Sequence, residues 1–253
     1  MKINNKLTET VLLGVRTGVW RGICRKKHTA EKVCRGSIVL HNQGFYEKYI
    51  KRSLDCLLAS CACIILSPLM VLIAILVTAK FGSPILFSQD RIGRGEKIFK
   101  LYKFRSMTDE RDVNGNLLPD KDRLTPFGKA LRSTSLDELP ELFSIIKGDM
   151  AVVGPRPLLP CYLPFFTPGE RVRHEVRGGL TVPEVLSGKT HTTWEEQFEY
   201  DVDYAENITF KKDFIIIIAT IKILVKRVDS QFGGDVRIPL NEERVKKMEG
   251  ENI

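Results

Sequence analysis

The sequence predicts an α/β protein, mostly helical with a small β-hairpin, in which a re-entrant membrane helix-hairpin carries a compact cytoplasmic domain. Three observations predict this class. Cys56 to Ala79 is a run of 24 residues without a charge, with Ser67-Pro68 at its centre. Residues 83–107 then alternate between apolar and polar side chains around Gly93 and Gly95. Stretches of helical character follow, the last of them apolar with a basic end.

The first 52 residues hold the positive charge of the chain. They contain 12 basic and 3 acidic residues, a net charge of +9, whereas the whole chain carries +8 and the remainder therefore −1. A basic arm beside a nearly neutral domain argues against a nucleic-acid-binding face and for attraction to an anionic membrane surface. A soluble basic tail is the alternative. With 43% hydrophobic and 28% charged residues, a folded core is expected.

The cysteines and the N-terminus indicate the compartment. The six cysteines include no C-x-x-C pair, and three of them lie in the apolar run, so neither a disulfide framework nor a zinc site is predicted. The N-terminus lacks the apolar core and cleavage site of a secretory signal. The working domain is therefore expected to face a reducing cytoplasm.

The apolar run is long enough to span a bilayer, but its proline divides it into two halves of 12 residues. Proline kinks a helix, and each half would measure about 18 Å, enough to enter one leaflet and return. Basic residues flank both ends, with Lys51 and Arg52 before the run and Lys80 after it. A re-entrant hairpin keeps both flanks cytoplasmic, as the positive-inside rule favours. A bitopic span and a buried soluble helix remain as alternatives.

The other elements follow in order along the chain. Two short strands flank the turn at Gly93 and Gly95, residues 112–123 form a loop, and residues 125–134 form a short helix. Another helix opens at Ser135, residues 177–190 are loop-rich, and residues 193–207 are helical and acidic. The apolar part of the stretch at 213–228 covers only 12 positions, which indicates an interfacial or core helix.

The stretch "TSLDELPELFSIIKGDMAVVGPRP", residues 134–157, concentrates acids beside arginine. Ser135 and Glu138 have the spacing of a capping box, which by itself explains Glu138 as a structural residue. It does not explain the nearby groups suited to phosphate, which are Lys103, Arg105, Arg132 and Arg156. Arginine binds phosphate with two hydrogen bonds, and vicinal carboxylates hold Mg²⁺ or supply a nucleophile. The pattern indicates phosphoryl chemistry next to a membrane.

From about Phe45 to the C-terminus, the chain resembles the bacterial sugar transferase family, the monotopic phosphoglycosyl transferases that initiate glycan assembly on polyprenyl phosphate. The motifs that carry the resemblance are "FYEKYIKRSLD", Ser67-Pro68, "GSPILFSQDRIG", "FKLYKFRSM", "LTPFGKALRSTSLDELPELFSIIKGDMAVVGPRPLL" and "FEYDVDYAENITFKKDF". In length it resembles the minimal members, such as the enzyme initiating bacterial N-linked glycosylation.

The resemblance implies transfer of a phospho-sugar from a UDP-sugar to polyprenyl (undecaprenyl) phosphate, giving a polyprenyl-diphospho-sugar and UMP. It implies that Asp137 is the nucleophile of a covalent aspartyl intermediate and that Glu138, with Asp137, binds Mg²⁺. The phosphate contacts fall to Arg132, Arg156, Lys103 and Arg105, with a structural ion pair as the alternative for each. Ser67 and Pro68 would form the re-entrant kink that seats the site at the inner leaflet of the bacterial cytoplasmic membrane, where downstream glycosyltransferases are further candidate partners.

The predicted organisation is a basic arm at 1–44, the re-entrant helix at 45–80, a cytoplasmic catalytic domain at 81–230 and a C-terminal tail at 231–253. One segment departs from the family pattern. Residues 179–190 read "GLTVPEVLSGKT", with Val182, Pro183 and Glu184 where small or aromatic residues are usual, and Lys189 in place of arginine. This departure affects donor identity first, because lysine lacks the planar fork of arginine.

Two other classes of function compete with the transferase. The altered loop and the additional arm suit a catalytically silent membrane scaffold that recruits other glycan-assembly enzymes and releases no UMP. A soluble nucleic-acid-binding module is disfavoured because the positive charge is confined to the arm and no aromatic residues interleave with it.

Overall fold

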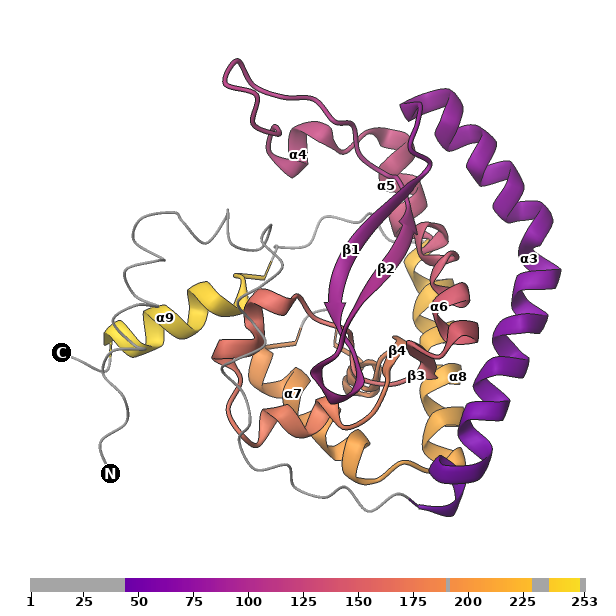
Figure 1. Cartoon of the computed structure of the whole chain (residues 1–253), viewed down its shortest axis with the longest axis vertical. Coiled ribbons are helices and arrows are strands. Elements are labelled where there is room, and N and C mark those ends of the chain that lie inside the picture. The colour runs from indigo at the N-terminus through magenta and orange to yellow at the C-terminus, as the bar shows by residue number, and fades with distance from the viewer. Residues whose placement is uncertain (1–43, 190–191, 229–236, 251–253) are drawn as a thin grey trace.

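The computed structural model describes residues 44–189, 192–228 and 237–250. A long N-terminal helix lies along one side of a compact domain, and a short C-terminal helix lies on the opposite side (Figure 1). The predicted basic arm falls outside the described residues except for Gly44.

The apolar run forms helix α3 (Arg52–Phe81), which continues from a π-helical segment, η2 (Tyr46–Lys51). Pro68 lies inside α3, and the Ser67 hydroxyl donates a hydrogen bond of 2.8 Å to the Ile64 carbonyl. Figure 1 shows that α3 changes direction near its middle but does not turn back on itself. The two halves thus remain one bent helix, because proline costs only the local hydrogen bond of its own turn.

Both halves of α3 pack against the same domain. In the first half, Ala59 joins a core cluster with Leu101, Leu142 and other residues of the domain. In the second half, Ile73 and Val77 join a cluster with Phe104 and Leu131. Since one face of the helix contacts one domain along its length, the buried positions recur at helical spacing.

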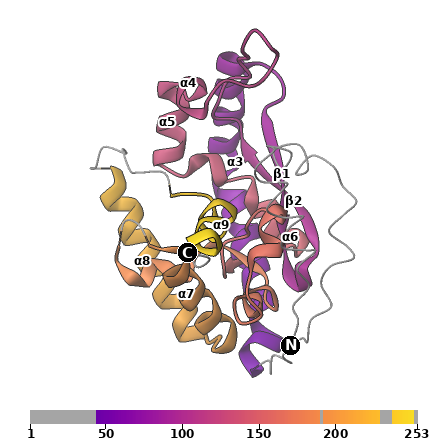
Figure 2. The same cartoon turned by 90° about the vertical axis from the view of Figure 1, so that its left-hand side faces the viewer.

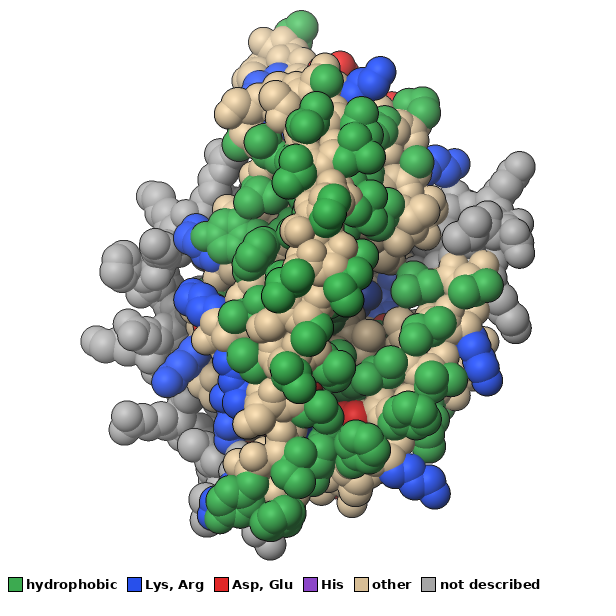
Figure 3. Space-filling view, turned by 90° about the vertical axis from the view of Figure 1, so that its right-hand side faces the viewer, with side chains coloured by type: hydrophobic (Ala, Val, Ile, Leu, Met, Phe, Trp, Pro, Cys, Tyr) green, Lys and Arg blue, Asp and Glu red, His purple; other side chains and the backbone are tan. Residues whose placement is uncertain are grey.

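The opposite face of α3 is apolar and exposed. Its exposed side chains come in neighbouring pairs, three of them spaced seven residues apart, at Leu57–Leu58, Ile64–Ile65, Val71–Leu72 and Ile75–Leu76. Only 11% of the most apolar window of this helix is buried, so the alternative of a buried soluble helix is wrong. Helix α8 (Phe210–Val228) extends the same apolar face beside α3, and lysine and arginine side chains border it (Figure 3).

The predicted β-hairpin is confirmed. Strands β1 (Leu86–Ile92) and β2 (Ile98–Phe104) pair antiparallel, with Leu86 opposite Phe104 and Ile92 opposite Ile98. The turn between them contains a short helix, η3 (Arg94–Glu96), and Gly95 adopts a positive φ of 63° there. Glycine meets this requirement without steric cost.

A second, parallel pair of strands was not predicted. Strand β3 (Met150–Val153) pairs with β4 (Gly178–Thr181), which lies within the segment predicted to be loop-rich. The strands have four residues each, and β4 begins with two glycines, so neither shows an extended alternating pattern. At Gly179 a Cβ would lie 2.1 Å from the Gly154 backbone nitrogen, so only glycine permits this approach.

Short helices connect and cover these strands. The predicted helix at 125–134 is confirmed as α5 (Pro126–Ser133), and that at 193–207 as α7 (Trp194–Glu206), which begins with a capping box between Thr193 and Glu196. The remaining helices are α4 (Asp120–Arg123), η4 (Leu136–Glu138), α6 (Glu141–Lys147), η5 (Pro160–Phe165), η6 (Glu170–His174) and η7 (Pro183–Ser187). Helices α7 and α8 lie on the side of the domain away from the β1–β2 hairpin (Figure 2).

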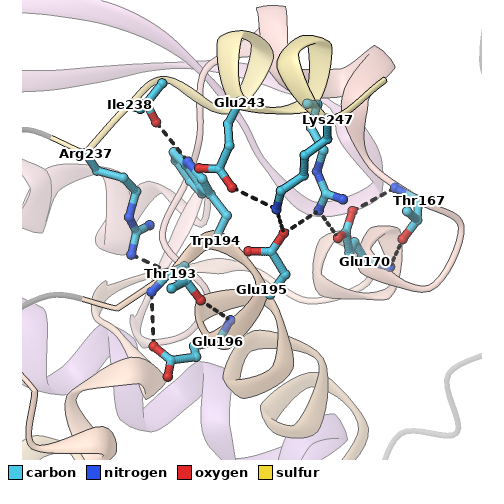
Figure 4. A network of polar contacts seen from close by, with 11 residues as sticks. Thr167, Glu170, Thr193, Trp194, Glu195, Glu196, Arg237, Ile238, Glu243 and Lys247 are labelled. Carbon is cyan, nitrogen blue, oxygen red and sulfur yellow. Dashed lines mark hydrogen bonds and ion pairs between the residues drawn. The ribbon is translucent and has the colours of Figure 1, made fainter. Parts of the chain in front are cut away.

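The segment predicted as a C-terminal tail contains helix α9 (Leu240–Gly250). Leu240 and Val245 are buried in a core cluster that includes residues of η5 and α7. The indole nitrogen of Trp194 donates a hydrogen bond of 3.0 Å to the Ile238 carbonyl, and the Arg237 guanidinium lies 4.5 Å from the Trp194 ring centroid (Figure 4). This terminal helix is therefore an integral part of the domain.

Candidate active site

A lysine and two carboxylates from three elements meet at the end of the hairpin. The Lys103 ammonium on β2 lies 2.5 Å from a Glu138 oxygen on η4 and 3.1 Å from a Glu141 oxygen on α6. The Glu141 side chain is buried, and burial raises its pKa although Lys103 opposes the shift. Sequence reasoning assigned no role to Glu141, although it lies only three residues after Glu138.

Asp137 lies beside this cluster and is almost completely buried, with 7% of its surface exposed. Burial raises its pKa to about 6, and the neighbouring Glu138 carboxylate adds to the shift, while Lys103 and Arg132 oppose it. Among the residues that the structure describes, no cation forms an ion pair with Asp137 within 4.0 Å. A buried carboxylate without a paired cation is poised to bind a metal ion or to react.

The capping-box interpretation of Ser135 and Glu138 is wrong. Ser135 adopts a left-handed conformation, with φ 55° and ψ 18°, and makes no side-chain cap. The helix itself begins only at Glu141, and Glu138 instead pairs with Lys103. A non-glycine residue in this conformation carries strain of the order of 1 kcal/mol, which typically accumulates at functional sites.

Arg132 is fixed near the acids by a close contact between α5 and the end of β2. Its guanidinium donates a hydrogen bond of 2.9 Å to the Ser106 hydroxyl. Helix α5 approaches this point because Gly128 has no side chain: a Cβ there would lie 1.8 Å from the Ser106 carbonyl oxygen. The exposed side of Arg132 remains available to an anionic ligand.

Arg156 is exposed between two buried prolines, and a buried ion pair fixes its backbone. The Arg173 guanidinium donates a hydrogen bond of 2.7 Å to the Arg156 carbonyl and pairs with Asp201, each side chain being 1% exposed. Arg91, which sequence reasoning did not select, donates to the neighbouring Pro157 carbonyl at 3.0 Å. Burial lowers the pKa of Arg91, and the nearby charge of Arg156 adds to this, so positive charge is concentrated here.

Two sets of predicted site residues lie away from Asp137, Glu138 and Glu141. The Arg105 guanidinium binds the Phe81 carbonyl at 3.1 Å and pairs with Asp109 at 2.6 Å, which secures the end of α3. The structural alternative fits Arg105 better than a phosphate contact. Ser67 and Pro68 are exposed on α3.

The residues present fit a magnesium ion shared with a substrate. The described residues contain no cluster of three or more metal-ligating side chains. Mg²⁺ nevertheless binds commonly through one or two carboxylates, with substrate phosphates and water completing the shell. Asp137, as a buried carboxylate without a paired cation, and the adjacent Glu138 would supply such ligands.

The segment that departs from the family pattern contains η7 and leads toward α7. The Lys189 ammonium pairs with Glu196, which also caps α7. The Thr192 hydroxyl lies 3.2 Å from a Glu184 carboxylate oxygen. These contacts engage Lys189 and Glu184 with Glu196 of α7 and with Thr192, which both lie beyond the segment.

The family model described as "Bacterial sugar transferase" matches residues 46–227. The chain is 50% identical over 150 residues to "Uncharacterized sugar transferase EpsL" of Bacillus subtilis (strain 168), covering 59% of this chain and 74% of that protein. It is 35% identical over 185 residues to the UDP-N-acetylgalactosamine-undecaprenyl-phosphate N-acetylgalactosaminephosphotransferase of Aeromonas hydrophila, covering 70% and 44% of the two chains. It is 33% identical over 197 residues to the undecaprenyl-phosphate galactose phosphotransferase of Salmonella typhimurium, covering 71% and 41%.

The chain thus spans less than half of the latter two relatives but most of the first. The matched range includes α3, the hairpin, the acid cluster and α8. Helix α9 lies beyond it. On these grounds the protein belongs to the bacterial sugar transferase family.

Proposed function

We propose that this chain transfers a phospho-sugar from a UDP-sugar to polyprenyl phosphate, releasing UMP and committing the sugar to a bacterial glycan pathway. The single observation that carries the proposal is Asp137, a buried carboxylate without an ion-pair partner among the described residues, next to a lysine, two further acids and exposed arginines. The name of the Aeromonas relative contains a UDP-sugar and undecaprenyl phosphate, and that of the Salmonella relative contains undecaprenyl phosphate and galactose, which supports these substrate classes.

In the first step, an Asp137 carboxylate oxygen attacks the β-phosphorus of the UDP-sugar. A bond forms between that oxygen and the phosphorus, and the phosphoanhydride bond breaks. Its electron pair leaves with UMP, so the phospho-sugar becomes bound to Asp137 as an acyl phosphate. Exposed Arg132 and Arg156 contact the diphosphate, and Lys103 orients Glu138.

In the second step, a phosphate oxygen of the lipid attacks the same phosphorus. The acyl phosphate bond between the phosphorus and the Asp137 oxygen breaks, and its electron pair restores the carboxylate, leaving the polyprenyl-diphospho-sugar. Mg²⁺ held by Asp137 and Glu138 would neutralise diphosphate charge. Two steps allow a soluble donor and a lipid acceptor to use one site in turn.

The position of α3 supports re-entrant, monotopic attachment to the cytoplasmic leaflet. Both halves of α3 pack on one domain, so a straight span would draw that domain into the bilayer. The bend near Pro68 and the exposed apolar faces of α3 and α8 allow insertion into one leaflet instead (Figure 3). Basic residues at both ends of α3 favour the cytoplasmic side.

The test uses the full chain in detergent with Mg²⁺, polyprenyl phosphate and a panel of UDP-sugars, and measures UMP release. We expect release with a preferred donor and its loss in Asp137→Asn. Asp149→Asn is the matched control, because Asp149 lies in the same stretch but pairs with Lys147 at 2.9 Å. Without acceptor, mass spectrometry should find the phospho-sugar on the peptide containing Asp137. Silence with every donor, in protein that still binds membranes, would favour the scaffold alternative.

A further inference from the structure

A cavity of about 220 Å³ lies at the N-terminal end of α3, where η2 and α3 meet the turn at η3 and the segment between η6 and β4. Its wall contains five cationic side chains, which are Lys48, Lys51, Arg52, Arg94 and Arg177. No residue of the acid cluster lines it. Such a concentration of positive charge is a typical footprint of an anion site.

The acids of the cavity do not neutralise these cations. Glu47 and Asp55 also line it. Asp55 accepts a hydrogen bond from the Val152 amide and lies 3.6 Å from Lys51, which is itself paired with Asp213 at 2.7 Å. With five cations and two acids, the lining carries an excess of three positive charges, of which Asp213 behind Lys51 compensates one.

Two of the arginines are held in place by backbone carbonyls rather than by acids. Arg52 donates to the Ile145 and Ile146 carbonyls at 2.6 and 2.8 Å, and Arg177 donates to the Gly148 carbonyl at 2.9 Å. Burial, with the neighbouring charges of Arg94 and Arg52, lowers the pKa of Arg177. These guanidinium groups are therefore pre-organised and keep part of their donor capacity for a ligand.

The cavity is separate from the proposed reaction centre. Its arginines bind the C-terminal end of α6, whereas Asp137 and Glu138 precede the N-terminal end. Helix α6 has seven residues, which at roughly 1.5 Å per residue places about 10 Å between its ends. An anion bound here would anchor the protein and would not react with Asp137.

Next to the cavity, η2 and the residue before it expose apolar side chains: Phe45 is 72% exposed, Tyr49 59% and Ile50 43%. Lys48, which lines the cavity, lies between them in the sequence and is also exposed. A ligand with a phosphate and acyl chains would satisfy both features, which a soluble phosphate would not. We propose that this cavity binds the phosphate of an anionic phospholipid headgroup, an inference that rests on the membrane attachment proposed above.

The test measures retained lipid on the full chain in detergent by native mass spectrometry, after incubation with phosphatidylglycerol or phosphatidylcholine. The double variant Lys48→Gln/Arg94→Gln removes two exposed cations whose side chains form no hydrogen bond or ion pair within the described part of the chain. We expect this variant to retain at least about tenfold less phosphatidylglycerol than the wild type, because hydrogen bonds to charged groups are stronger than those between neutral groups. Lys211→Gln/Lys222→Gln is the control, because it removes the same charge from exposed positions of α8 outside the cavity.

Thermal unfolding without lipid shows whether each variant is folded. If the double variant does not fold, Arg94→Gln alone replaces it in the lipid measurement. Equal retention by the cavity variant and the wild type would overturn the proposal, as would equal loss in the α8 control. Stabilisation by inorganic phosphate to the same extent would contradict a lipid ligand. Displacement by polyprenyl phosphate would assign the cavity to the acceptor instead. Because the readout is binding, a failed transferase assay leaves this result interpretable.

Discussion

Two clusters in this protein are each built around one lysine, a buried one at Lys51 and a half-buried one at Lys103, and they differ in how their acids are satisfied. At Lys51, Asp213 accepts from the lysine, from the Tyr46 hydroxyl at 2.9 Å and from the Tyr204 hydroxyl at 2.6 Å. At Lys103, the lysine contacts Glu138 and Glu141, while the neighbouring Asp137 has no cation within ion-pair distance among the described residues.

The difference separates a structural cluster from the one that we propose to be reactive. The Lys51 cluster joins η2, α3, α7 and α8, and its hydrogen-bonding groups satisfy one another. In the Lys103 cluster, burial first and the neighbouring Glu138 carboxylate second raise the pKa of Asp137, the residue that we propose as the nucleophile. Substitutions in the Lys51 cluster should therefore unfold the protein, whereas substitutions in the Lys103 cluster should abolish its activity.

The largest expected effect on stability comes from Lys51→Met. Removal of the lysine leaves Asp213 buried without its cation, which costs about 3–5 kcal/mol of unfolding free energy. Chemical unfolding in detergent measures this loss.

Lys103→Met should instead lower UMP release at least about a hundredfold with a smaller loss of stability, because Glu141 can be protonated. Equal destabilisation by both variants would remove the distinction between the clusters.

Asp137→Asn should stabilise the metal-free protein at high pH. The pKa of Asp137 is raised from 3.8 to about 6, so the folded protein holds this proton more tightly than the unfolded chain. The contribution of Asp137 to the free energy of unfolding is therefore complete below pH 4 and is lost as the pH rises through 6. Asparagine does not titrate, and about two pKa units correspond to about 2–3 kcal/mol above pH 7. Unfolding of both proteins in EDTA between pH 4 and 8 tests this. A difference in unfolding free energy between the two proteins that does not change with pH would contradict the raised pKa of Asp137.

Tyr204→Phe tests the Lys51 cluster by a smaller change. The Tyr204 hydroxyl is buried, and burial together with Asp213 raises its pKa well above the usual value. Its loss removes one hydrogen bond to Asp213 and should cost about 1–2 kcal/mol without affecting UMP release per folded molecule. Tyr102→Phe is the control, since Tyr102 is 40% exposed on β2. Loss of activity beyond loss of folded protein would argue against a structural role.

The smallest effect is expected at the surface of α9. Lys247 pairs with Glu195 at 2.6 Å and Glu243 at 3.0 Å, but its side chain is 50% exposed (Figure 4). Exposed ion pairs contribute little because water screens them. The thermal midpoint of Lys247→Gln should match that of the wild type, which would show that burial distinguishes the two lysine clusters from this one. A clear drop would show that α9 depends on its surface charges.

Much of the fold could be predicted from local sequence. The uncharged run, the alternating segment and the helix at 125–134 determine α3, the β1–β2 hairpin and α5, because their patterns have the periods of helix and strand. The β3–β4 pair could not be predicted in this way. Its pairing joins residues about 30 positions apart, and its close approach depends on glycines rather than on an alternating pattern.

For the candidate site, the sequence by itself determined which residues are candidates: Asp137 and Glu138 side by side, with Lys103, Arg132 and Arg156 as cations. Only the tertiary structure decided how each is used. It placed Lys103 between Glu138 and the unselected Glu141, left Asp137 buried without an ion pair among the described residues, and bound Arg105 to the end of α3. The physical reason is that pairing and burial depend on contacts between β2, η4 and α6, which sequence spacing does not specify.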